Sequence, residues 1–97
     1  MEFVLSSVEE LAEIFKALSD PTRLKIFQLL LDKKRQCVNA ITKHLDVSQS
    51  AVSQHLRVLK QAGFVNNERN GYHIHYSINE DVFNKFKELT HDIFAHE

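Results

Sequence analysis

Polar side chains recur along one stripe of a helix predicted near the middle of the chain. At about 100° per residue, four of them share a single helical face: Ser50, Gln54, Arg57 and Gln61. Ser53 lies on the flank of this face. Glutamine pairs with adenine, arginine with guanine or phosphate, and serine with either kind of group. The stripe contains no carboxylate, so it predicts a surface suited to the major groove of DNA.

The helix that must carry this stripe is predicted over residues 49–62. Ser48 is a favourable N-cap, and Gly63 is a favourable stop signal. Val52, Leu56 and Leu59 fall on the face opposite the polar stripe and predict anchoring in a core. Histidine 55 flanks this apolar face, and we expect it to be structural rather than a reader of bases.

Three shorter helices are predicted before this one. The first covers about residues 7–18, behind two overlapping capping boxes formed by Ser6 with Glu9 and Ser7 with Glu10. The second runs from Pro21, capped by Asp20, to about Asp32 and has little polar surface. A basic linker (residues 33–35) leads to a third helix over 38–45. This helix, the turn at 46–48 and the 49–62 helix make a helix-turn-helix.

Within the first predicted helix, the apolar side chains fall into two groups. The main stripe, at helical spacing, contains Val8, Leu11, Phe15 and Leu18. Ile14 and Ala17 lie off this stripe and could face a second subunit.

After Gly63 the apolar period changes from helical to alternating, which predicts a β-hairpin. Residues 72–78 place Tyr72, Ile74, Tyr76 and Ile78 on one face and the imidazoles of His73 and His75 on the other. Asn70-Gly71 predicts the turn, with positive φ at both residues. Arg69 supplies a cation at the tip, so the hairpin is predicted to be a wing that reaches DNA backbone or minor groove.

A last helix is predicted over about residues 80–96, capped by Asn79. Its apolar residues spread over more than one face, and the surplus predicts a second copy of the chain as partner. We therefore expect residues 1–97 to form a single domain, mainly α (α+β), with about five helices and a two-stranded wing. The first and last helices are expected to form a homodimer interface.

Composition limits the alternatives. The chain has 97 residues, 43% apolar content and a formal charge of −1, which allows one modest core. Acids gather near the two ends, and only Asp46 and Glu68 lie between positions 33 and 79. One cysteine, no signal-peptide pattern and no long apolar run predict a cytoplasmic protein with no membrane segment.

Three segments resemble the ArsR/SmtB family of small dimeric winged-helix repressors. They are FKALSDPTRLKI (15–26), VSQSAVSQHLRVL (47–59) and AGFV (62–65), and the resemblance extends over roughly residues 11–93. It implies that Gln49, Ser50, Ser53 and Gln54 face the major groove, and that the wing over 69–73 contacts backbone. The candidate DNA contacts are then Ser48, Gln49, Ser50, Ser53, Gln54, Arg57, Arg69, Asn70 and His73.

Many members of this family sense metals, but the ligand positions are largely lost here. The Cys-Val-Cys box of the family corresponds to Gln36-Cys37-Val38-Asn39, which keeps one thiol. The ligand positions on the last helix correspond to Glu80, Val82, Ile93 and His96, two of which are apolar. We predict no metal and no cofactor, and the residual candidate ligands are Cys37, His91 and His96. Cys37 as a redox sensor is an open alternative.

The expected function is sequence-specific DNA binding by a homodimeric repressor on an imperfect palindrome. The alternative is a winged helix that serves only as a protein-interaction module. No glycine-rich phosphate loop, nucleophile elbow or paired carboxylates indicate an enzyme. The sequence identifies neither the operator nor an effector.

Overall fold

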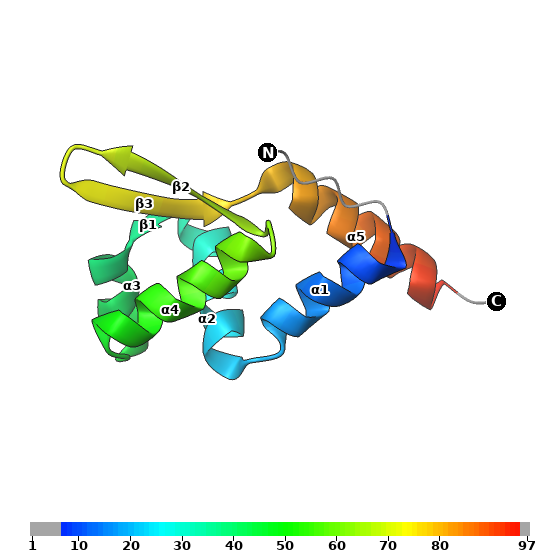
Figure 1. Ribbon diagram of the computed structural model, residues 1–97, viewed down its shortest axis with the longest axis horizontal. Coiled ribbons are helices and arrows are strands. Elements are labelled where there is room, and N and C mark those ends of the chain that lie inside the picture. The colour runs from blue at the N-terminus through cyan, green and yellow to red at the C-terminus, as the bar shows by residue number, and fades with distance from the viewer. Residues whose placement is uncertain (1–6, 96–97) are drawn as a thin grey trace.

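The fold consists of five helices and a small antiparallel sheet. The computed structural model describes residues 7–95. In chain order, the elements are α1 (Val8–Leu18), α2 (Pro21–Lys33), β1 (Arg35–Cys37), α3 (Val38–Leu45), α4 (Gln49–Gln61), β2 (Val65–Asn70), β3 (His73–Ile78) and α5 (Glu80–Phe94). Helices α1 and α5 lie side by side at one end, and the hairpin of β2 and β3 projects at the other (Figure 1). No helix within this range is long and apolar enough to cross a membrane.

Side-chain caps fix where the helices begin, as the sequence predicts. The Ser7 hydroxyl accepts a hydrogen bond from the Glu10 N–H at 3.2 Å and donates to the Glu10 carboxylate at 3.0 Å. The Asp20 carboxylate accepts from the N–H groups of Thr22 and Arg23 at 2.9 and 3.1 Å. These bonds satisfy amides that have no partner inside the helix. Residue Ser6 of the second predicted capping box lies outside the described range.

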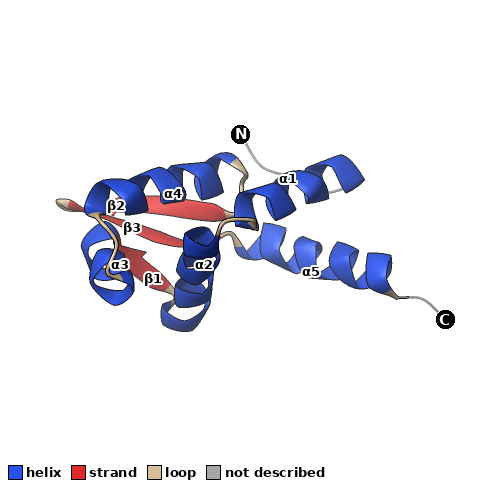
Figure 2. Ribbon diagram, turned by 90° about the horizontal axis from the view of Figure 1, so that it is seen from below, coloured by secondary structure: helices blue, strands red, loops and turns tan. Residues whose placement is uncertain are grey.

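The core forms where α2, α3, α4 and the sheet meet (Figure 2). Val52, Leu56 and Leu59 of α4 are fully buried, which confirms the predicted anchoring face. Phe64, also fully buried, lies in the middle of an aromatic cluster. Its ring centroid is 5.0 Å from that of Phe27 and 5.3 Å from that of Phe86, distances at which aromatic rings attract one another.

A closed corner joins the end of α4 to the start of α5. Gly63, at φ 79°, reverses the chain, so that the Phe64 N–H donates to the Leu59 carbonyl at 3.0 Å. This is the Schellman arrangement that glycine favours after a helix. Asn79, which caps α5, donates from its side chain to the Gly63 carbonyl at 3.1 Å and from its backbone to Phe64 at 2.9 Å. The hairpin therefore leaves and re-enters the domain at one hydrogen-bonded point.

Helix α1 is rotated relative to the sequence prediction. Ile14 and Ala17 are buried in the core, with 1% and 4% exposure, whereas Val8 and Phe15 are 69% and 42% exposed. The prediction that Ile14 and Ala17 could join the dimer interface was wrong, because both are buried within the domain, and Val8 and Phe15 of the predicted main stripe lie outside the core. Ile14, Ala17 and Leu18 belong to the core cluster where α1 contacts α2 and α4, whereas Phe15 packs its ring against Phe86 of α5.

The sheet has three strands rather than the two predicted. Lys34 adopts φ 72° and ends α2, and the chain then enters β1, which pairs with β3. The interpretation of residues 33–35 as a linker missed this strand, because three residues carry too little alternation to identify a strand. The sheet order is β1-β3-β2, so β3 lies in the middle of the sheet.

The hairpin turn is shifted by one residue from the prediction. Asn70 pairs with His73 in the ladder, so the loop contains Gly71 and Tyr72, and only Gly71 has positive φ. A single positive φ at the first loop residue is typical of a type II′ turn, in which glycine takes that place. Tyr72 is therefore at the tip and fully exposed instead of sharing the face of Ile74 and Tyr76.

Leu56→Ala should lower the free energy of unfolding by about 2–5 kcal/mol, because it leaves a cavity beneath α4. Arg57→Ala, one residue further on the exposed side, is the matched control and should change it by less than about 0.5 kcal/mol. Urea denaturation of both variants measures the difference. Equal effects of the two substitutions would contradict the assignment of the two faces.

Candidate nucleic-acid interface

The outer face of α4 brings five predicted DNA contacts together. Gln49, Ser50, Ser53, Gln54 and Arg57 are all exposed and line one open, shallow surface. Within residues 7–95 no hydrogen bond or ion pair occupies their side chains. All of their donors and acceptors are therefore available to an external partner.

Charge on this face is neutral to positive. Helix α4 contains no acidic residue and carries Arg57 and Lys60 on its exposed side. Its N-terminus, capped by Ser48, adds the positive end of a helix dipole. The Ser48 hydroxyl accepts from the Ala51 N–H at 3.2 Å, so this side chain holds the helix start while remaining exposed. The combination attracts a polyanion and offers directional hydrogen bonds to it.

The wing supplies a second group of exposed polar residues. Arg69 and Asn70 at the end of β2 and His73 at the start of β3 all face solvent. Tyr72 lies between them with its side chain completely open. Sequence reasoning missed Tyr72 as a candidate contact, because the alternation of β3 grouped it with the apolar residues. A fully exposed aromatic residue next to a glycine in a tight turn was the available signal.

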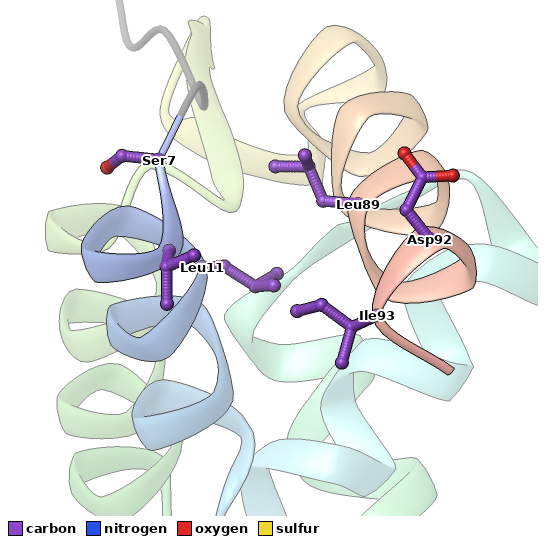
Figure 3. A pocket seen from close by; sticks show the side chains of 6 residues that line it. Ser7, Leu11, Leu89, Asp92 and Ile93 are labelled. Carbon is purple, nitrogen blue, oxygen red and sulfur yellow. The ribbon is translucent and has the colours of Figure 1, made fainter. Parts of the chain in front are cut away.

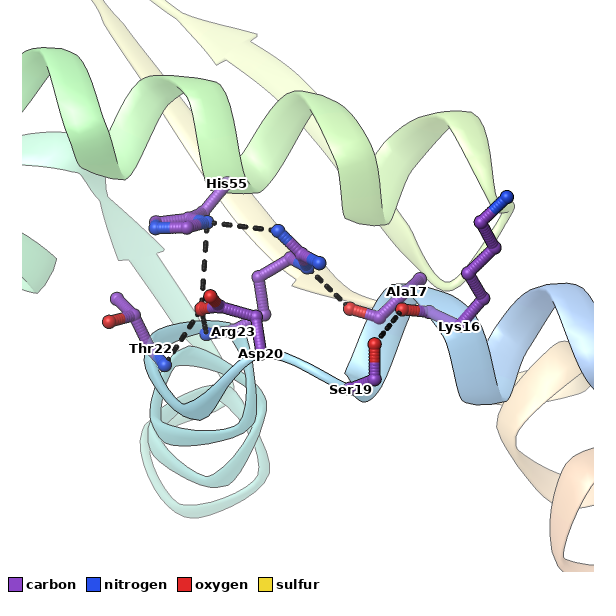
Figure 4. Close-up of polar contacts among 7 residues, drawn as sticks. All are labelled: Lys16, Ala17, Ser19, Asp20, Thr22, Arg23 and His55. Atoms are coloured by element: carbon purple, nitrogen blue, oxygen red, sulfur yellow. Dashed lines mark hydrogen bonds and ion pairs between the residues drawn. The ribbon is translucent and has the colours of Figure 1, made fainter.

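A polar cluster lies on a different side of α4 and connects it to the corner between α1 and α2 (Figure 4). Arg23 donates from Nε to the Ala17 carbonyl, and its Nη1 lies 3.3 Å from His55 Nδ1. The Asp20 carboxylate is 3.9 Å from the same imidazole nitrogen. His55 is thus structural, as predicted, but the role of Arg23 was not foreseen.

The backbone holds the Asp20 carboxylate in its ionised form. The pKa of Asp20 is lowered, first by the hydrogen bond from the Arg23 N–H, and further by the nearby His55 imidazole and the Thr22 N–H. Desolvation opposes this shift and is outweighed. A charged cap at the start of α2 also interacts favourably with the helix dipole.

The residual metal candidates are far apart in the fold. Cys37 is half-buried at the start of α3 and faces His75 across the β1–β3 ladder, whereas His91 is exposed in the last turn of α5. His96 lies outside the described residues. Between residues 7 and 95, no three His, Cys, Asp or Glu side chains are grouped so that they could hold a metal ion.

Comparison with known proteins identifies the family of this chain. Residues 20–67 match the family model described as "Bacterial regulatory protein, arsR family". The chain is 37% identical over 89 residues to an uncharacterised HTH-type transcriptional regulator of Methanocaldococcus jannaschii, covering 92% of this chain and all of that protein. It is 42% identical over 69 residues to the transcriptional repressor SdpR of Bacillus subtilis, covering 71% and 76% of the two chains.

Solved structures agree with these relatives. An ArsR-like transcriptional regulator from Rhodococcus sp. RHA1 superposes with a TM-score of 0.78 at 33% identity, covering 88% of this chain and 79% of that one. Fold and exposed helix together define a winged helix-turn-helix transcriptional regulator. Within that class, the chain belongs to the arsR family of bacterial regulatory proteins.

Asp20→Asn should weaken the dependence of stability on acid pH while retaining a side chain that can cap α2. Because the pKa of Asp20 is lowered on folding, its contribution is complete above its usual pKa and is lost as pH falls through the lowered value. The unfolding free energy of the wild type should therefore fall more steeply than that of the variant between about pH 5 and pH 2. Urea titrations across this range measure both slopes, and parallel slopes would contradict the assignment.

Proposed function

We propose that the protein is a homodimeric repressor that reads an imperfect palindrome in double-stranded DNA. Helix α4 enters the major groove with Gln49, Ser50, Ser53, Gln54 and Arg57. The observation that carries this proposal is the outer face of α4, which is polar, free of carboxylates and without partners in the described part of the chain. The naming of SdpR as a transcriptional repressor supports the direction of regulation.

The wing completes the proposed contact. Arg69, Asn70 and His73 reach the sugar-phosphate backbone or the minor groove beside the site read by α4. Figure 1 shows the hairpin extending away from α1 and α5, toward the end of the domain that also holds α3 and the start of α4. Phosphate contacts of this kind set the register of a protein on DNA, while the groove contacts of α4 select the sequence. Affinity should fall steeply with salt concentration, because bound cations are released from the phosphates.

A second copy of the chain is the partner proposed for the end formed by α1 and α5. Val8 and Phe94 are 69% and 71% exposed there, and Phe15 and Ile93 are 42% and 44% exposed. Between the helices lies an apolar hollow bordered by Leu11, Leu89 and Ile93 (Figure 3). Apolar side chains concentrated on two adjacent helices favour a symmetric contact that buries them. Two α4 helices related in this way would enter successive major grooves about 34 Å apart.

The protein requires no cofactor for this function, and we assign it no catalytic step. The proposed DNA partner implies that the protein acts in the cytoplasm. The test of the overall proposal is selection of bound duplexes from a random DNA pool by the purified protein. Recovery of an inverted repeat supports the proposal, and recovery of no common sequence would overturn it.

Arg57→Ala should weaken binding of the selected duplex by about 1–3 kcal/mol, because it removes a guanidinium from the groove-facing side of α4. A gel-shift titration measures the change. Lys25→Ala is the matched control, since it also removes one exposed cation but lies on α2, and it should leave the affinity unchanged. Identical affinities for wild type and Arg57→Ala would exclude this face as the DNA-reading surface.

Ile93→Asp should convert the dimer to a monomer, because it places a charge in the apolar contact between α5 helices. Sedimentation velocity gives the mass, and circular dichroism verifies that the variant is folded. Lys25→Asp introduces the same side chain on the exposed side of α2 and should leave the dimer intact. A wild-type protein that sediments as a monomer at all concentrations would refute the interface.

A further inference from the structure

Arg23 connects three helices with one side chain. It lies in the first turn of α2, donates from Nε to the Ala17 carbonyl in the last turn of α1, and approaches His55 Nδ1 on α4 at 3.3 Å. Residues 23 and 55 are 32 positions apart, so this contact is a long-range tie between the α1–α2 corner and the DNA-reading helix. Within residues 7–95, no other hydrogen bond joins a side chain of α2 to a side chain of α4.

The tie depends on the protonation state of the imidazole. A guanidinium is always charged and can only donate, so His55 Nδ1 must offer its lone pair to Arg23. The neutral ring can do this when its other nitrogen carries the proton. A protonated ring has no lone pair, and its Nδ1–H would then point toward Arg23 as a second donor. Protonation of His55 therefore converts an attractive contact into a repulsive one.

Asp20 offers the protonated ring a different partner. Its carboxylate oxygen lies 3.9 Å from the same Nδ1, while the backbone amides of Thr22 and Arg23 keep it ionised. Asp20 and Arg23 are the charged groups that contact His55 among the described residues. From α1, Glu13 and Lys16 border the hollow around Arg23, and Val58 and Gln61 of α4 close it. The ring thus has a donor on one side and an acceptor within reach on the other.

We infer that Arg23 is a positioning residue for α4, and that protonation of His55 exchanges its partner on the α1–α2 corner from Arg23 to Asp20. The inference rests on the proposed function, because it predicts how well α4 is presented to DNA. Helix α1 belongs to the proposed dimer interface, so the tie also sets the angle of α4 relative to the dimer axis. Imidazole side chains change charge between about pH 5 and pH 8, and acidification across this range should shift α4 away from the position that the contact with Arg23 sets.

The substitution His55→Gln separates the pH effect of this tie from the pH effects of all other histidines. His55→Gln keeps an acceptor oxygen for Arg23 but cannot be protonated. The dissociation constant of the selected duplex is measured by fluorescence anisotropy at about pH 8 and about pH 5.5 for both proteins. The ratio of the two constants should be larger for wild type by roughly tenfold, within the range of ordinary coupling between sites. The remaining histidines, including His73 on the wing, contribute equally to both ratios.

His55→Leu and Arg23→Gln complete the comparison. Leu removes the acceptor, so affinity should be reduced at both pH values and should lack the extra acid sensitivity of wild type. Arg23→Gln removes the tie from the α2 side. In the Arg23→Gln background, His55→Gln should no longer change the ratio of the dissociation constants at the two pH values. Equal pH ratios in wild type and His55→Gln would overturn the inference even if both bind DNA tightly.

Amide hydrogen exchange of the free protein tests the tie without DNA. Protection factors along α4 should change on acidification in wild type and remain level in His55→Gln, after correction for intrinsic exchange rates. If wild type selects no DNA sequence but shows this change in protection, the proposed function fails and the tie stands. Level protection in both proteins would refute the tie independently of DNA binding.

Discussion

Complete burial of Val52, Leu56 and Leu59 is the constraint on which the proposed DNA-reading surface depends. A helix of 13 residues is not stable alone in water, so α4 exists because one of its sides is held by α2, α3 and the sheet. The remaining circumference is then free to be polar, and the side chains there need no partner within the chain. Rigidity of the buried side gives directional hydrogen bonds on the outer side a defined geometry.

Helix α1 likewise has one side that is buried in the domain and one side that remains available for assembly. Ile14 and Ala17 belong to the core, while Val8 and Phe15 remain on the outside beside α5. One helix thus contributes to the stability of the domain and to the surface proposed for the partner chain. Arg23 attaches to the end of this helix and to α4. The path from the proposed dimer contact to the helix proposed to read DNA therefore runs through one turn of backbone and one guanidinium.

Sequence patterns predicted most of the helical framework, because each helix carries its own signals. Asp20 and Ser48 act as caps, Gly63 ends α4, and the apolar period of α4 identified its buried side. The failures occurred where tertiary contacts decide. Residues of α1 on both sides are apolar, so periodicity could not tell which side faces α4. Strand β1 exists only because β3 is available to pair with it.

The candidate site was predictable to the same extent. The residues proposed to face the groove follow from helix geometry once α4 is placed, whereas the turn of the wing is displaced by one residue from the sequence prediction. Asn70-Gly71 satisfied the usual hairpin rule, but pairing of Asn70 with His73 moved Tyr72 to the tip. The contact of Arg23 with His55 joins segments 32 residues apart and leaves no local pattern in the sequence.

The closed corner between Gly63 and Asn79 has a consequence for diversification. Both ends of the hairpin are secured there by bonds among Gly63, Phe64 and Asn79, and none of these bonds involves the distal strand residues. Only the distal part of the wing, beyond the pairing of β3 with β1 at residues 75–77, is in this sense a detachable module, whose tip chemistry can be exchanged while the helical body keeps its packing. The proposed grip of the wing on flanking DNA can therefore change through the tip alone, independently of the α4 residues proposed to select the bases.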